Sequence, residues 1–376
     1  MENQLDYGSA ARRFASQYPL LSSLMTQISF WIIANAVLGL IIHLYVRSLV
    51  AIYPLIGEQR LGPVLIIAMT LGALYGTTLG LIDHYIGKFS FQNRSIGQII
   101  LVKTVLSITT LTALLWLILD KLHDVLSARL SLPAALPGND EFWHYVLVML
   151  VVYYLFMTLI INLAIQVNKK FGPGILLPLL WGKYRNPAEQ ERVFLFMDLK
   201  SSTSMAETCG HLKYSAFIRD SFYDINQVIP RYNAEVYQYV GDEIVMSWTI
   251  TEGLRKLACV HFFFACEKQF EDKAQYYLQN YGRVPQFKAG LHMGTVVAVE
   301  IGDIKRDIAY HGDTLNTAAR LQSLCNDYDR RLLTSEYLLR CIEAQDSFII
   351  ERLGMIQLKG KAAPTGVVSL ELIRKP

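Results

Sequence analysis

The sequence predicts two domains of different fold class, an α-helical membrane domain followed by a domain of the α+β class. Two observations indicate the membrane domain. Hydrophobic residues make up 52% of the 376 residues, and the mean hydropathy is +0.28, which is high for a soluble protein. The α+β domain is indicated by the second half, where short apolar runs of strand length alternate with longer amphipathic runs of helix length.

Four apolar stretches in the first half are long enough to cross a membrane as helices, which takes about 20 residues each. They cover residues 28–50, 64–85, 99–119 and 143–167. The second stretch carries Gly72, Gly76 and Gly80, a spacing that forms a groove for a closely packed helix. These glycines either make such a contact, within one chain or between two, or are merely tolerated in a membrane helix.

The spans divide the chain into four segments. They are an N-terminal segment over residues 1–27, a four-helix transmembrane domain over 28–167, a linker over 168–192 and a second domain over 193–376. An even number of spans places both termini on one side of the membrane. The basic residues on that side are Arg12, Arg13, Lys88, Arg94, Lys169, Lys170, Lys183 and Arg185, against Arg60, Lys121 and Arg129 on the other. Since cytoplasmic loops carry the excess of Lys and Arg, we expect a multi-pass inner or plasma membrane protein, in contact with membrane lipid, whose termini and second domain are cytoplasmic.

Charge and cysteine content narrow the classes of partner. The net charge of +3 and the lack of any dense Lys/Arg run argue against nucleic acid as a partner. All five cysteines lie in the second half without a paired metal-ligand spacing, which is typical of reduced thiols in a cytosolic domain.

Two aspartates are the chemical centre of the second half. Asp198 ends the apolar run 193–197, which predicts a buried strand, and Asp242 lies at the turn of a hairpin predicted over residues 234–248. Carboxylates at neighbouring strand ends suit a pair of hard divalent cations with phosphate as the remaining ligand. The alternative interpretation is that Asp242 is only a turn residue, because Gly-Asp pairs are common in turns.

The remaining elements complete the α+β pattern. After the strand over residues 193–199 we expect a helix from Ser201–Thr203 to about residue 229, a second long helix over 251–281, and a hairpin of strands 286–292 and 296–302 that turns at 293–295. Backbone amides at the first helix start, just past Asp198, suit phosphate oxygens. The order indicates helices packed on an antiparallel-rich sheet.

A third polar segment lies on a helix predicted over residues 314–325. Asn316 and Arg320 are four residues apart and therefore project from one face. An amide and a guanidinium could hold a ribose oxygen and a phosphate oxygen, or the pair could be an ordinary polar helix face. Near the end of the chain, Lys359 and Lys361 lie on a strand-to-turn segment where a lysine could meet a polyphosphate.

Four of these segments resemble the motifs of class III nucleotidyl cyclases, the family of adenylate and guanylate cyclases. They are FMDLKSST, YVGDEIV, GDTLNTAARLQ and LGMIQLKGK, and they occur in the family's order between residues 193 and 372. The resemblance implies a ferredoxin-like catalytic domain that is active as a dimer, with each site built across the interface. One protomer would supply Asp198 and Asp242, and the other Asn316 and Arg320. Since this chain carries both sets, the resemblance implies a homodimer with two equivalent sites.

The resemblance also implies the reaction. The ribose 3′-hydroxyl of a nucleoside triphosphate attacks its own α-phosphorus and expels pyrophosphate, with two Mg²⁺ or Mn²⁺ ions per site. One ion, held by both aspartates, would lower the pKa of the hydroxyl, and the other would clamp the triphosphate. Arg320 would balance charge on the α-phosphoryl oxygens, Asn316 would orient the ribose, and Lys359 would hold the terminal phosphates. Thr203, in the helix start after Asp198, is expected to lie at the substrate.

Base recognition departs from the family pattern. Adenine-selective members usually carry a Lys four residues before the second metal aspartate, and an Asp or Thr before the Asn-Arg helix; here these places hold Gln238 and Ala309. Gln238 can both donate and accept hydrogen bonds, whereas the Ala309 side chain can do neither. The guanine-selective pattern, Glu with Cys, is absent too. Thr314 and nearby backbone groups are the other candidates for reading the base.

The function expected from the sequence is a membrane-anchored adenylate cyclase that converts ATP to 3′,5′-cyclic AMP and pyrophosphate. One alternative keeps the chemistry with GTP or a pyrimidine nucleotide. Another is a non-catalytic membrane receptor with a cyclase-like dimerisation module. The presence of both metal aspartates and of the Asn-Arg pair argues against the receptor.

Overall fold

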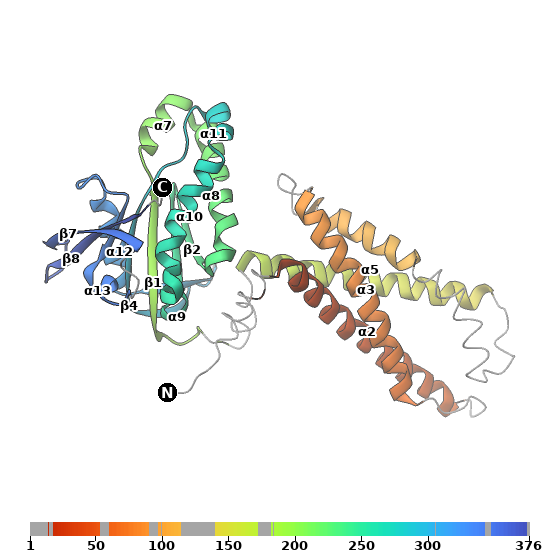
Figure 1. Cartoon of the computed structure of the whole chain (residues 1–376). Helices are drawn as coiled ribbons and strands as arrows, with labels where there is room; N and C mark the ends of the chain where they lie inside the picture. The colour runs from red at the N-terminus through yellow and green to blue at the C-terminus, as the bar shows by residue number, and fades with distance from the viewer. Residues whose placement is uncertain are drawn as a thin grey trace. The chain divides into compact units, whose positions relative to one another are not determined.

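The computed structural model describes residues 14, 18–52, 60–89, 97–98, 100–113, 140–171, 182, 184–304, 306–342 and 347–373. The chain divides into two compact units, Met1–Leu176 and Leu177–Pro376. The first unit consists of helices, and the second is a sheet with helices on its faces (Figure 1).

Three described helices of the first unit are long and apolar enough to span a membrane. They are α2 (Pro19–Ile52), α3 (Leu61–Phe89) and α5 (Asp140–Phe171). These helices contain three of the four predicted spans. The remaining predicted span, 99–119, coincides with a shorter apolar helix over Ile100–Ala113, and its last six residues lie outside the described part of the chain.

The glycines of α3 form a close contact with α2 in the same chain. A Cβ atom added at Gly72 would lie 2.5 Å from the Trp31 carbonyl oxygen, and one added at Gly76 would lie 2.7 Å from the Cα atom of Ile28. At Gly80 the nearest α2 backbone atom would be 3.0 Å away. No side chain fits at Gly72 or Gly76 without a shift of the α2 backbone, so the predicted helix contact is confirmed and lies within one protomer.

The first unit also buries an ion pair between helices. The Lys103 ammonium lies 2.6 Å from the Asp83 carboxylate, and the two side chains are 8% and 14% exposed. The side-chain amide of Gln27 donates to the other Asp83 oxygen at 2.6 Å. Because a buried charge without a partner is costly, this pair constrains how α2, α3 and the helix over Ile100–Ala113 can pack.

The second unit is built on one sheet with the strand order β2-β3-β1-β4-β6-β8-β7, and β5 pairs with β4. The strands are β1 (Ala188–Leu199), β2 (Glu235–Val240), β3 (Glu243–Thr249), β4 (Phe287–Ile301), β5 (Asp307–His311), β6 (Leu332–Ser335), β7 (Phe348–Ile356) and β8 (Thr365–Leu372). The strand pairings of the described residues are antiparallel except for β4 with β6. The predicted antiparallel-rich α+β architecture is therefore confirmed.

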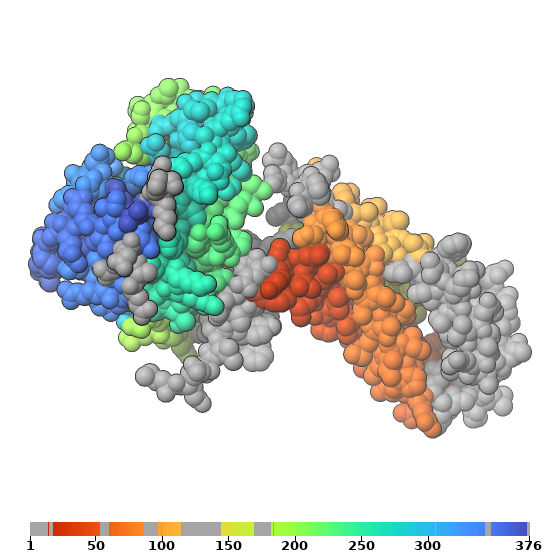
Figure 2. All heavy atoms as spheres, viewed as in Figure 1, coloured from red at the N-terminus to blue at the C-terminus, as the bar shows by residue number. Residues whose placement is uncertain are grey.

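Helices cover both faces of this sheet. They are α7 (Ser202–Cys209), α8 (His211–Tyr232), α9 (Ile250–Leu254), the 3₁₀ turn η1 (Arg255–Leu257), α10 (Ala258–Asp272), α11 (Ala274–Tyr281), α12 (Asp313–Leu324) and α13 (Glu336–Arg340). The main core lies between the sheet and the helices α8 and α10. In Figure 2 the side chains of α8, α10 and α11, coloured green to teal, form the surface over this part of the sheet.

The alternation along β1 decides which face Asp198 occupies. Val193, Leu195 and Met197 belong to the core under α8 and α10, whereas Phe194 packs with Ala318 of α12. Successive strand residues point to opposite faces, so Asp198, in step with Phe194, faces α12.

The predicted hairpin over 286–302 is wrong. These residues form the single strand β4, which pairs with β1 over twelve residues from Ala188 to Leu199. Residues 293–295 continue the strand instead of turning. The reason is that β1 starts at Ala188, earlier than the predicted strand at 193, and so pairs with β4 across this segment. Gly294 marks a close approach and not a turn, since a Cβ there would lie 2.7 Å from the Thr314 hydroxyl.

Both long helices predicted in this unit are interrupted. The first is divided at Gly210 into α7 and α8, because Gly210 has a φ of 77°. The second, over 251–281, breaks at Lys256 and Leu257, whose φ values are 50° and 55°, and again at Lys273 between α10 and α11. The hairpin over 234–248 and the helix over 314–325 are confirmed as β2–β3 and α12.

Candidate active site

Asp198 lies near the end of β1 and contacts two residues that sequence reasoning missed. The Lys288 ammonium and the Gln322 side-chain amide each lie 3.1 Å from the same Asp198 oxygen. Lys288 is opposite Asp198 in the β1–β4 register, and Gln322 comes from α12. The carboxylate is thus held between the sheet and a helix, with its side chain 23% exposed.

Gly290 of β4 explains why Gln322 can reach Asp198. A Cβ atom at Gly290 would lie 2.2 Å from both the Ala318 carbonyl oxygen and the Gln322 backbone nitrogen. Only glycine leaves room for the α12 backbone to lie directly on β4.

Asp242 follows Gly241 in the turn between β2 and β3, where the sequence predicted it. Its Oδ2 atom is buried and has no hydrogen-bond partner within the described residues. Its neighbour Glu243 is paired with Asp198 in the β1–β3 register. The turn therefore brings a third carboxylate next to the two predicted ones.

The pKa values of this acidic cluster reflect the crowding. Burial, followed by the charges of Asp198 and Asp242, raises the pKa of Glu243 to about 7. Burial also raises the pKa of Asp198, and the charge of Asp242 raises it further, against the opposing effect of Lys288. Excess negative charge at one end of the sheet is an environment that a cation stabilises.

The residues present fit the predicted divalent metal ions. The buried Asp242 oxygen without a partner is an available acceptor, and its charge acts on Asp198. Within the described ranges, no three His, Cys, Asp or Glu side chains converge as a complete metal cage. Mg²⁺ is commonly bound by one or two carboxylates together with substrate phosphates, so two aspartates with an open remainder match that mode.

The chain passes from Asp198 directly into the start of α7. Ser201, with a φ of 60°, turns the backbone, and no side chain caps the helix start. Thr203 is exposed on the first turn of α7. The backbone amides of this turn are therefore close in the chain to the acidic cluster and suited to an anion.

Asn316 and Arg320 are four residues apart on α12. Asn316 is exposed and Arg320 is partly buried, whereas Thr314, Thr317, Ala318, Leu321 and Gln322 are buried. Arg320 precedes Gln322 by two residues, which corresponds to a rotation of about 200° around the helix. Asp198 is contacted by Gln322, so the fold does not direct Arg320 toward Asp198 of its own chain.

The Arg320 guanidinium is only partly partnered. Its Nη1 atom is buried and makes no hydrogen bond to any described residue. Its Nη2 atom lies beside the turn at Gly360, 3.3 Å from where a Cβ would stand. A buried guanidinium nitrogen without an acceptor is suited to an incoming anionic oxygen.

The two lysines of the LKGK segment differ in their surroundings. Lys359 is exposed. The Lys361 ammonium pairs with the Asp313 carboxylate at 2.8 Å and donates to the Thr317 hydroxyl at 2.8 Å. Of the two, Lys359 is the lysine presented to solvent, as required of a residue that would meet a polyphosphate.

The residues at the base-recognition positions lie on β2 and β5. Gln238 is exposed near the end of β2, and Ala309 is 7% exposed in β5. Their neighbours Tyr237 and Tyr310 are in contact, since the Tyr310 backbone nitrogen donates to the Tyr237 hydroxyl at 3.2 Å. The Thr314 hydroxyl donates to the Thr295 carbonyl at 2.9 Å and is buried, so this hydroxyl already holds α12 to β4.

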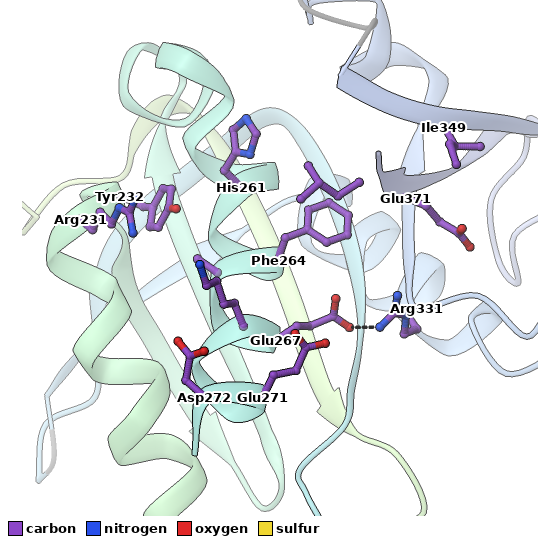
Figure 3. A pocket seen from close by; sticks show the side chains of 13 residues that line it. Arg231, Tyr232, His261, Phe264, Glu267, Glu271, Asp272, Arg331, Ile349 and Glu371 are labelled. Carbon is purple, nitrogen blue, oxygen red and sulfur yellow. Dashed lines mark hydrogen bonds and ion pairs between the residues drawn. The ribbon is translucent and has the colours of Figure 1, made fainter. Parts of the chain in front are cut away.

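A cavity of about 620 Å³ lies on the other face of the sheet, over α8, α10 and the β7–β8 pair. Figure 3 shows the ion pair of Arg331 with Glu267, at 2.8 Å, among its lining residues, with His261 and Phe264 on α10. None of the predicted site residues lines it.

Comparison with known proteins follows the same division of the chain. Residues 186–370 match the family model described as the adenylate and guanylate cyclase catalytic domain. The chain is 39% identical over 207 residues to adenylate cyclase 2 of Rhizobium meliloti, covering 55% of this chain and 57% of that protein. It is 25% identical over 171 residues to an adenylate cyclase of Anabaena cylindrica, covering 44% and 34%.

The fold has counterparts among solved structures. A bacterial light-regulated adenylyl cyclase superposes with a TM-score of 0.50 at 21% identity, over 58% of this chain and 64% of that one. This chain thus spans between a third and two thirds of the lengths of these relatives. Its residues 186–370 belong to the class III cyclase family, the family of adenylate and guanylate cyclases, and form its catalytic domain.

Proposed function

We propose that this protein is a membrane-anchored adenylate cyclase that converts ATP to 3′,5′-cyclic AMP and pyrophosphate. One observation carries the proposal: the domain presents two incomplete and complementary half-sites. The acidic half contains an Asp242 oxygen without a partner, and the cationic half contains an Arg320 nitrogen without a partner. A metal-bound nucleotide triphosphate would satisfy both halves at once.

The two half-sites require a second copy of the chain. Gln322 of α12 contacts Asp198, while Arg320 and Asn316 share a different face of the helix. In a symmetric dimer, the acidic half of one protomer faces the cationic half of the other, and the symmetry produces the pairing twice. We therefore propose a homodimer with two equivalent sites, each holding two Mg²⁺ or Mn²⁺ ions.

The protein's own groups would then act by position and charge. Asp198 and Asp242 would hold the metal ions, which lower the pKa of the ribose 3′-hydroxyl and neutralise the triphosphate. Arg320 would donate to the α-phosphoryl oxygens as charge builds there, and Asn316 would orient the ribose. Lys359 would pair with the terminal phosphates, and the α7 start at Thr203 would donate backbone amides.

ATP is the proposed substrate, and the other nucleoside triphosphates are its competitors. The relative that is 39% identical is named an adenylate cyclase. At the base positions, the exposed Gln238 retains both a donor and an acceptor, whereas the Thr314 hydroxyl is engaged with Thr295. Because Gln238 can pair with more than one base edge, GTP and the pyrimidine nucleotides are the competing substrates.

The membrane helices support the proposed location. With α2, α3, α5 and the predicted fourth span crossing the membrane, both termini lie on one side, and the excess of basic flanking residues favours the cytoplasm. The catalytic domain would then meet cytoplasmic ATP, and the spans would contact membrane lipid.

Product analysis tests this function. The intact chain, purified with its membrane domain, is incubated with Mn²⁺ and separately with ATP, GTP, CTP and UTP, beside Asp242→Ala as control. We expect cyclic AMP as the main product, lost in the variant. A different cyclic nucleotide would overturn the substrate, and no cyclic product from an intact dimer would favour the receptor interpretation.

A further inference from the structure

Lys361 forms an ionic contact that ties the LKGK turn to α12 within one chain. Its ammonium lies 2.8 Å from the Asp313 carboxylate and donates to the Thr317 hydroxyl at 2.8 Å. Thr317 in turn donates to the same Asp313 oxygen at 3.3 Å. The Lys361 side chain is 20% exposed and the Asp313 side chain is 60% exposed, so the contact lies at the surface with its ammonium side shielded.

The turn itself is well anchored. The Lys361 backbone nitrogen donates to the Leu358 carbonyl at 3.0 Å, and the Leu358 side chain is 2% exposed. Gly360 adopts a φ of 74° and passes beside the Arg320 guanidinium. The segment that carries Lys359 is therefore held over the helix that carries Arg320.

Asp313 and Arg320 share one side of α12. They are seven residues apart, which is about two turns, and Asn316 and Thr317 lie between them on the same side. The hydrogen bond from Lys361 lowers the pKa of Asp313, and the charge of Arg320 lowers it further, so Asp313 is ionised at neutral pH. Arg320 thus has a carboxylate within electrostatic range and a nitrogen with no hydrogen-bond partner.

We propose that Lys361 is a positioning residue that neutralises Asp313 and so prevents this carboxylate from capturing Arg320. The proposal rests on the proposed cyclase function, in which Arg320 must be free to meet the α-phosphoryl group. Without Lys361, the Asp313 carboxylate has no ion-pair partner, and Arg320 is the cationic residue on α12 that can approach it. Arg320 then turns toward Asp313, and the developing charge on the phosphoryl group loses its donor.

A direct phosphate contact by Lys361 is the competing interpretation. The geometry disfavours it, because the Lys361 ammonium already binds Asp313 and Thr317, whereas Lys359 on the same turn is exposed. The two interpretations differ in what removal of Asp313 does to a Lys361 variant. If Lys361 shields Arg320, removing the carboxylate restores activity; if Lys361 binds phosphate, it does not.

The test is a double-mutant cycle in the full-length chain, with kcat and KM measured for ATP and Mn²⁺. We expect Lys361→Met to lower kcat by at least about tenfold with little change in KM, since Arg320 acts on the transition state. Asp313→Asn alone should stay within about threefold of the parent, and Lys361→Met/Asp313→Asn should recover to within about threefold. Lys361→Gln, with and without Asp313→Asn, is measured in parallel in case the methionine variant folds poorly.

Lys359→Met is the matched control on the same turn. It should raise KM, and Asp313→Asn should not rescue it. Failure of Asp313→Asn to rescue either Lys361 variant, with melting temperature and dimer content unchanged, would overturn the shielding role while leaving the cyclase function intact. A parent protein that makes no cyclic nucleotide would overturn both.

Discussion

Two inactive variants should restore each other's activity if the active site is built across the dimer. Asp242→Ala removes the carboxylate with an unpartnered oxygen in the acidic half-site, and Arg320→Ala removes the guanidinium with an unpartnered nitrogen in the cationic half. Each variant alone leaves both sites of its homodimer defective. Loss of one preorganised charged donor commonly lowers kcat by about 10²- to 10³-fold, and we expect at least that from Arg320→Ala.

The magnitude of the recovery follows from the geometry. In a mixed dimer, one site combines both lesions, and the other combines the intact aspartates of one chain with the intact Arg320 of its partner. With equal expression and random pairing, about half of the dimers are mixed, so about a quarter of all sites are intact.

The assay is cyclic AMP formation in membranes from cells that express the two variants together, with differently tagged chains to measure mixed-dimer content. We expect about a quarter of the parental activity, and Asp198→Ala with Asp242→Ala as the control pair should show none. Mixed dimers that remain as inactive as either variant would refute a site shared between protomers.

Three further outcomes test the packing. Asp83→Asn should destabilise the first unit by about 3–5 kcal/mol, because it leaves Lys103 buried and unpaired. Thermal unfolding in lipid should show a lower melting temperature that recovers in Asp83→Asn/Lys103→Met, and an unchanged melting temperature would contradict the role of the pair. Gly76→Leu should disrupt the α2–α3 contact and lower the melting temperature, because a Cβ there would already lie 2.7 Å from the α2 backbone. Gly62→Leu on the same helix has open space around it and should not; equal melting temperatures of the two variants would contradict a close helix contact at Gly76. Burial lowers the pKa of His292 to about 4 from 6.5, so the unfolded chain binds more protons between these values, and the catalytic unit should lose about 2–3 kcal/mol as pH falls from 6.5 to 4. His292→Gln should lack this loss in unfolding experiments, and an identical pH dependence would contradict it.

Much of the catalytic unit was predictable because its signals are local. A Gly-Asp pair between two apolar runs specifies a hairpin, and a four-residue spacing places Asn316 and Arg320 together on a helix wherever that helix lies. The same locality explains the errors. The segment 286–302 carries turn-like residues, but its straight course depends on β1 extending to Ala188 as a partner.

The contacts made by the site residues depended on packing between distant segments. Lys288 meets Asp198 through strand register, and Gln322 meets it because Gly290 lets α12 lie on β4. Residues that are 90 or more positions apart leave no periodic signal in a single sequence, so these partners were not predicted. For the same reason the contacts of Lys361 with Asp313 and Thr317 were not predicted.

The sequence by itself therefore determined the long apolar helices of the first half, the α+β class of the second half and the identity of its chemical groups, since these follow from hydropathy, periodicity and residue type. The tertiary structure decided that α3 packs closely against α2 within one chain and that Asp313 forms an ion pair with Lys361. It also decided that Arg320 projects away from Gln322 and from the Asp198 of its own protomer. Those outcomes depend on which backbones can approach closely and which charges are neutralised when they do, and both are settled only when the elements pack.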